Sequence, residues 1–165
     1  MKPTLIVALF AAFAPVPAYA FDVNGVALGA SEANILDTFP SAYCKRLEWP
    51  SHAADRRCDD AEIAFAGTDA RITFFLRDDV MQGYDLRFAA SERPRVAGVL
   101  KSQWGAPAAE AKELIQRKGK PDREVYKITW AKDRDRAVLV WRPDRKRCWL
   151  TVSRGDFAEE IYRVR

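Results

Sequence analysis

The stretch RITFFLRDDVMQGYDLRF, residues 71–88, predicts a β-hairpin. Apolar and polar side chains alternate, as in strands with one buried face, and Asp78-Asp79 is typical of a tight turn. With that pair at the tip, Leu76 faces Met81, and a β-bulge at Gln82-Gly83 restores the alternation beyond it. One predicted face then carries Ile72, Phe74, Leu76, Met81, Tyr84, Leu86 and Phe88, and the opposite face carries Thr73, Phe75, Arg77, Val80, Asp85 and Arg87.

Strand-like segments flank this hairpin. Upstream, AEIAFAG, residues 61–67, is predicted to turn at Thr68-Asp69 into the hairpin's first strand. Downstream, turns at Asp133-Arg134 and Asp144-Arg145 predict a three-stranded meander with a consistent register. In it, one face carries the pairs Tyr126–Trp141, Ile128–Leu139, Trp130–Ala137, Trp141–Cys148 and Leu139–Leu150. The other face carries Lys127, Thr129, Val138, Val140, Arg142, Trp149 and Thr151.

Short helices are predicted between the strands. Ser31 is expected to cap a helix that ends before Pro40, and Ser91 a second helix that ends at Gly105. A further short helix is predicted within residues 107–120, with Pro107 near its start and Gly119 past its end. The tail, residues 155–165, fits either a strand or a helix.

These elements predict an α+β fold in which short helices pack on one face of an antiparallel sheet. The fold is expected as one domain over residues 21–165, with a weak helix-plus-strands repeat whose halves are about 21–89 and 90–165.

Residues 1–20 have the pattern of a secretory signal peptide. Lys2 precedes a short apolar run, and Ala18 and Ala20 form an A-x-A cleavage site; a signal anchor is the alternative. No later segment approaches the roughly 20 apolar residues of a membrane helix, so no membrane anchor is expected after cleavage. The expected location is therefore periplasmic or secreted.

The charge pattern argues against nucleic acid as a partner. The formal net charge is +4, but acidic residues are interleaved with the basic ones, whereas nucleic-acid binders carry a denser basic stripe. The basic turn RPDRKRC, residues 142–148, is interpreted as a solvated hairpin tip in preference to a contact for anionic lipids.

The chain contains three cysteines. In an oxidising compartment a pair usually forms a disulfide, and we favour Cys44–Cys58, with Cys148 free in a strand. Closing the loop between Cys44 and Cys58 would stabilise the fold by about 3 kcal/mol, although spacing alone does not prove the connectivity.

No pattern of catalytic residues stands out. A nucleophile built from Cys44 or Cys58 with His52 would need a free thiolate, and Cys44, His52, Cys58 and Asp59 lack the paired spacing of metal ligands. We therefore predict no enzyme activity, no cofactor and no metal. The alternative is an envelope enzyme or small-ligand binder that uses the loop between Cys44 and Cys58.

A further set of residues forms a spaced pattern in both halves of the chain: Gly25, Leu28-Gly29-Ala30-Ser31, Ile35, Phe39-Pro40, Cys44, Cys58, Val99-Leu100, Trp104-Gly105 and Pro107. Through these residues the sequence resembles a group of small exported bacterial modules, the β-lactamase-inhibitor-protein-like repeats and the outer-membrane assembly lipoproteins of the BamE type. The resemblance implies helices on one face of an antiparallel sheet and a concave opposite face that binds partner proteins. The chain departs from these families in having no cysteine after the signal segment and only one cysteine in its second half.

The open face of the predicted sheet is the candidate functional surface. Large apolar side chains with charged neighbours are typical of protein recognition, so we predict a non-catalytic module that binds another envelope or secreted protein. The alternative is that the tail or residues 107–118 cover this face. The predicted partner-binding residues are Phe75, Lys127, Val138, Val140, Arg142 and Trp149.

Overall fold

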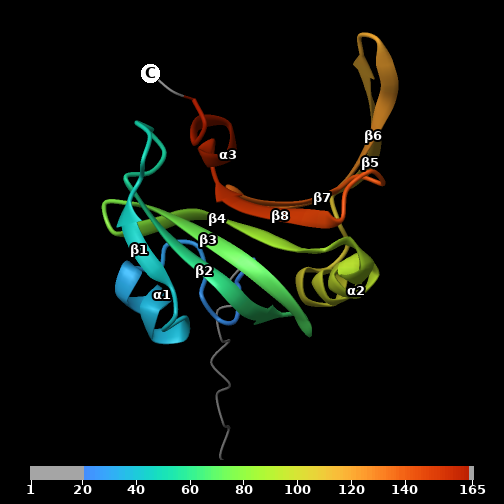
Figure 1. Ribbon diagram of the computed structural model, residues 1–165. Coiled ribbons are helices and arrows are strands. Elements are labelled where there is room, and N and C mark those ends of the chain that lie inside the picture. The colour runs from blue at the N-terminus through green and yellow to red at the C-terminus, as the bar shows by residue number, and fades with distance from the viewer. Residues whose placement is uncertain (1–20, 164–165) are drawn as a thin grey trace, which may run out of the picture.

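The computed structural model describes residues 21–163, so the predicted signal peptide lies outside the described residues. Eight antiparallel strands form one sheet in the order β1-β2-β3-β4-β8-β7-β6-β5 (Figure 1). The strands are β1 (Tyr43–Arg46), β2 (Arg56–Phe65), β3 (Thr68–Arg77), β4 (Val80–Ala89), β5 (Ala109–Arg117), β6 (Lys120–Lys132), β7 (Asp135–Trp141) and β8 (Arg147–Arg154).

The sheet consists of two four-stranded meanders that meet where β4 pairs with β8. Each meander follows a helix, α1 (Glu32–Thr38) or α2 (Arg93–Trp104). The sheet is strongly curved, with α1 and α2 on its convex side and α3 (Phe157–Glu160) on its concave side (Figure 1). We call these sides the outer face and the inner face.

The main hydrophobic core lies on the outer face. Ile35 of α1 and Leu100 of α2 are both fully buried against the sheet. The buried hydroxyl of Tyr84 donates a hydrogen bond to the carbonyl oxygen of Phe21 (2.8 Å), which ties the start of the described chain to β4. The core side chains from the strands are those of one alternating set, including Ile72, Phe74, Leu86, Phe88, Trp130, Leu139, Leu150 and Val152.

The predicted α+β class is wrong, because the sheet dominates the fold and the helices are small. The helices α1, α2 and α3 have only 7, 12 and 4 residues, whereas β6 alone has 13. The predicted helix over residues 107–120 is also wrong, since Ala109–Arg117 forms β5. Pairing with β6, from Ala109 opposite Thr129 to Arg117 opposite Lys120, overrides the helix-forming composition of this segment.

Two local predictions also need correction. The turn between β2 and β3 lies at Ala66-Gly67 instead of Thr68-Asp69, because both residues adopt the positive φ (51° and 74°) that a tight hairpin turn requires. Ser91 does not cap α2; it lies in a 3-10 turn over Ala90–Glu92, and the N-cap residue Glu92 makes no side-chain capping bond. Ser31 is confirmed as the cap of α1.

The predicted hairpin over residues 71–88 is confirmed. Asp78 and Asp79 have positive φ (50° and 60°) at the turn, and Leu76 lies opposite Met81. The register shift places Gly83 opposite Phe75, so the bulge falls at Gln82. The meander register is confirmed as well, including Tyr126 opposite Trp141, Ile128 opposite Leu139 and Leu139 opposite Leu150.

The disulfide prediction is confirmed. Cys44 of β1 is bonded to Cys58 of β2, which lies directly opposite it, and Cys148 is a buried free thiol. The bond indicates an oxidising, extracellular compartment. Within residues 21–163, no helix is long and apolar enough to cross a membrane.

Candidate binding surface on the inner face of the sheet

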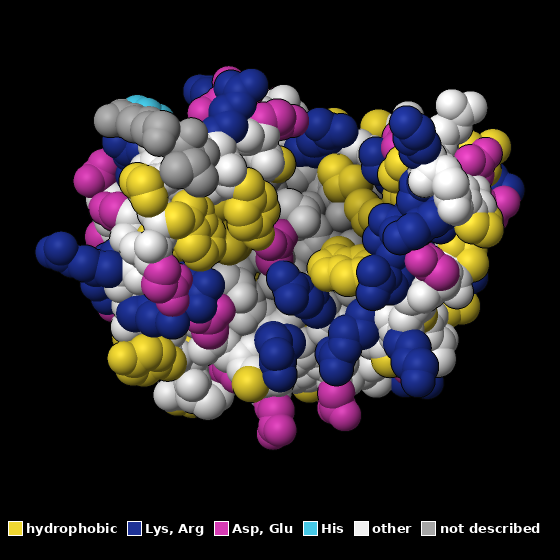
Figure 2. Space-filling view, turned by 45° about the horizontal axis from the view of Figure 1, so that its top comes forward, with side chains coloured by type: hydrophobic (Ala, Val, Ile, Leu, Met, Phe, Trp, Pro, Cys, Tyr) yellow, Lys and Arg dark blue, Asp and Glu magenta, His cyan; other side chains and the backbone are white. Residues whose placement is uncertain are grey.

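The inner face is organised as rows of side chains that run across the strands. One row, which we call the basic row, runs through Arg71, Arg87, Trp149 and Val140 to Lys127, each directly opposite the next on the neighbouring strand. The next row runs from Asp59 through Thr73, Asp85 and Thr151 to Val138. Figure 2 shows this face as a hollow in which apolar side chains are bordered by Lys and Arg.

Three of the predicted binding residues lie side by side in the hollow. Trp149 lies opposite Val140, and Val138 lies one row away, opposite Thr151. All three side chains are half-buried. The structure therefore brings together the apolar part of the predicted surface.

The predicted charged border is neutralised within the chain. The Lys127 ammonium group lies 2.8 Å from both carboxylate oxygens of Glu113. The Arg142 guanidinium donates hydrogen bonds of 3.0 and 3.1 Å to the two oxygens of Asp144. Neither cation is thus left without a counter-charge.

Phe75 lies on the inner face as predicted, but it is covered. Only 3% of it is exposed, and its ring lies 5.5 Å from that of Phe157 in α3. The indole nitrogen of Trp49 donates a hydrogen bond to the carbonyl oxygen of Ile161 (2.9 Å), which fastens the tail over the β1–β3 side. The tail therefore covers the β1–β3 half of the inner face, which was the alternative that the sequence left open. Phe75 is too deeply buried there to contact a partner.

A glycine makes this covering possible. A Cβ atom at Gly83 would lie 2.6 Å from the ring of Phe157, closer than real Cβ contacts come. The β-bulge at Gln82 brings Gly83, opposite Phe75, to the position where Phe157 packs. Residues 107–118, the other candidate cover, instead extend the sheet as its edge strand β5.

A pocket of about 270 Å³ lies between α3 and the apolar side chains of the hollow, and its lining residues include Asp85, Val138, Val140 and Tyr162. The Asp85 carboxylate accepts hydrogen bonds from the hydroxyls of Thr151 (2.7 Å) and Tyr162 (3.3 Å). Burial nevertheless raises the pKa of Asp85, because the hydrogen bonds and the nearby Arg87 offset the cost of desolvation only in part.

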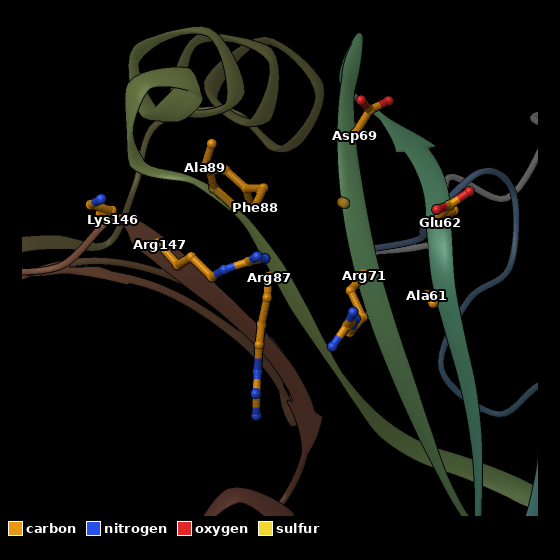
Figure 3. Close-up of a pocket in the computed structure, with 10 residues that line it drawn as sticks. Ala61, Glu62, Asp69, Arg71, Arg87, Phe88, Ala89, Lys146 and Arg147 are labelled. Carbon is orange, nitrogen blue, oxygen red and sulfur yellow. The ribbon is translucent and has the colours of Figure 1, made fainter.

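A larger cleft of about 580 Å³ lies at the α2 end of β3 and β4, and sequence reasoning did not identify it. Its cationic lining residues are Arg71, Arg87, Lys146 and Arg147. Figure 3 shows the side chains of Arg71, Arg87 and Arg147 on β3, β4 and β8 around one space, with Glu62 and Asp69 on its β2–β3 side. The alternation of the hairpin placed Arg87 on this face, but only the β4–β8 pairing brings Arg147 beside it.

The side chains considered for catalysis or metal binding are held in contacts that stabilise the fold. Cys44, Cys58 and Glu32 form a cluster with ligand-type atoms, but both sulfur atoms are in the disulfide, and Glu32 accepts two hydrogen bonds from Arg56 (2.6 and 2.8 Å). Burial raises the pKa of the Cys148 thiol to about 11, so the thiol remains protonated and is a poor nucleophile.

The loop between Cys44 and Cys58 helps to hold the tail. Leu47, Trp49, Ala53 and Ala54 all pack in the small cluster formed with Phe75, Phe157 and Ile161. His52, the histidine considered as a base, is exposed on this loop.

Comparison of the chain with models of protein families, with curated proteins and with solved structures found no match.

Proposed function

We propose that this chain is a non-catalytic, exported binding module that holds a partner protein in the uncovered half of the inner face. The supporting observation is that α3 covers one half of the inner face and leaves the other half open. Phe75 is sealed beneath α3, whereas Trp149 remains half-exposed in the hollow beside Val140.

The shape and composition of the hollow fit this role. A half-buried tryptophan with aliphatic neighbours is the kind of anchor on which binding energy concentrates in protein interfaces. The neighbouring Thr151 and Asp85 and the cations of the basic row surround it with polar groups, as in a typical interface rim. The partner proposed is another envelope or secreted protein, and the module acts in the periplasm or after secretion.

Site-specific photocrosslinking tests the proposal. A photoreactive phenylalanine analogue is placed at position 149, or at position 43 as a control, because Tyr43 is 70% exposed but lies on the edge strand β1. We expect a discrete crosslinked partner from position 149 and none from position 43.

The affinity of the purified partner is then measured by titration. Trp149→Ala should weaken binding about tenfold or more, whereas Tyr43→Ala should leave it within about twofold. Circular dichroism checks the fold of each variant. A Trp149→Ala chain that cannot fold would show that Trp149 belongs to the core, and equal affinity of the folded variant would also refute the proposal.

A further inference from the structure

The basic row begins with two arginines that repel each other. Arg71 of β3 and Arg87 of β4 are directly opposite neighbours on the inner face, and both are exposed. Like charges in this arrangement destabilise a sheet. Arg147, from the next strand along, extends into the same cleft (Figure 3), so three strands direct positive charge into one place.

Glu62 and Asp69 line the same cleft, but no described residue forms an ion pair with its cations. Within residues 21–163, Arg71, Arg87, Lys146 and Arg147 have no carboxylate oxygen within the 4.0 Å of an ion pair. Other cations nearby do have one, such as Lys127 with Glu113 and Arg142 with Asp144. The nearest acid along β4, Asp85, has its oxygens engaged by Thr151 and Tyr162.

We propose that the occupant of this cleft is an acidic, extended segment of a partner polypeptide. Its carboxylates pair with Arg71, Arg87 and Arg147, because guanidinium groups bind carboxylates through two parallel hydrogen bonds. An adjoining apolar side chain of the same segment packs on Trp149 and Val140. The inference rests on the proposed function and specifies the chemistry of the partner.

The spacing of the basic row sets the length of this segment. Neighbouring strands are about 4.8 Å apart, so the three steps from Arg71 through Arg87 and Trp149 to Val140 span about 14 Å. An extended polypeptide rises about 3.3 Å per residue, so about five residues cross the row. Acidic residues lie at the β3 end and the apolar residue at the β7 end.

A protein partner fits better than a polyanionic surface, because the cations continue without interruption into apolar side chains. Trp149 is opposite both Arg87 and Val140, so a ligand that covers the cleft also covers apolar surface. Aromatic, aliphatic and arginine side chains together are typical of the centre of a protein interface.

The test uses a phage-displayed library of short random peptides selected on the folded, disulfide-bonded chain. We expect the selected peptides to contain Asp or Glu next to an aromatic or aliphatic residue. Fluorescence anisotropy then measures their affinities. The triple variant Arg71→Gln, Arg87→Gln, Arg147→Gln should bind them at least about tenfold more weakly, and about 500 mM NaCl should weaken wild-type binding.

A matched triple variant controls for net charge. Arg46, Lys132 and Arg134 are exposed and lie outside the cleft, so their replacement by Gln removes the same charge and should change affinity by less than about twofold.

The other outcomes separate the inference from the proposed function. One outcome is that the selected peptides lack acidic residues, and that Trp149→Ala abolishes their binding whereas the triple arginine variant does not. This outcome would overturn the inference and leave the proposed function standing. Peptides insensitive to both variants would overturn both. Binding of phosphatidylglycerol vesicles or heparin through the same arginines, with no binding of acidic peptides, would also overturn the inference.

Discussion

Replacing Arg71 with glutamate should stabilise the fold. The Cβ atoms of directly opposite residues are about 5 Å apart, and we take about 7 Å between the guanidinium charges of Arg71 and Arg87. Because both side chains are exposed, a water-like dielectric applies, and their repulsion is about 0.6 kcal/mol. Arg71→Gln removes this term, and Arg71→Glu reverses its sign. The free energy of unfolding should therefore rise by about 0.5 and about 1 kcal/mol, respectively.

Urea unfolding followed by circular dichroism measures these gains. They should be largest at about 20 mM NaCl and shrink towards zero at about 500 mM, because salt screens exposed charges. Arg134→Glu makes the same charge change in an exposed turn and should give a smaller gain. The reasoning would be refuted if Arg71→Gln lowered stability at low salt, or if Arg134→Glu stabilised the protein as much as Arg71→Glu.

Three further variants test how the inner face and the loop are held. Gly83→Ala would place a Cβ 2.6 Å from the Phe157 ring and should lower the free energy of unfolding by about 1–3 kcal/mol; a urea midpoint equal to that of wild type would contradict this packing. Replacing Cys44 and Cys58 with serine should cost about 3 kcal/mol, and reductant should then have no effect on the unfolding curve of this variant. Burial raises the pKa of Asp85, so this carboxyl ionises at a higher pH in the folded chain than in the unfolded chain. The wild type therefore loses stability as the pH rises from about 4, the pKa of an unfolded aspartate, to the raised pKa of the folded state. Asp85→Asn should thus have the higher melting temperature at pH 7, by a margin that narrows on acidification; a constant margin would refute the assignment.

Sequence reasoning predicted the hairpins well because their signals are local. The alternation in residues 71–88, together with a turn of two aspartates, fixes which side chains share a face. It failed over Ala109–Arg117, where the only evidence for a strand is the pairing with β6. That strand is exposed at nearly every residue, so it shows no alternation of buried and exposed positions from which its structure could be predicted.

The candidate surface was predicted in part for the same reason. Val138, Val140 and Trp149 come from one meander, whose register follows from its turns. The covering of Phe75 depends on Phe157, a contact between distant parts of the chain. The partner of Lys127 is Glu113 on the strand that was taken for a helix, so the neutralisation of this border could not be foreseen.

The contrast between the two ends of the inner face bears on its function. At the β1–β3 side, the chain supplies its own cover, and α3 buries Phe75 against Phe157. At the α2 end, the described residues supply no cover and no ion pair for the arginines of the cleft, and Arg71 remains opposite Arg87. A single substitution to an acidic residue would relieve that repulsion. The carboxylates of an acidic partner segment would relieve the repulsion between Arg71 and Arg87 in the same way, because each guanidinium would then have an opposite charge beside it.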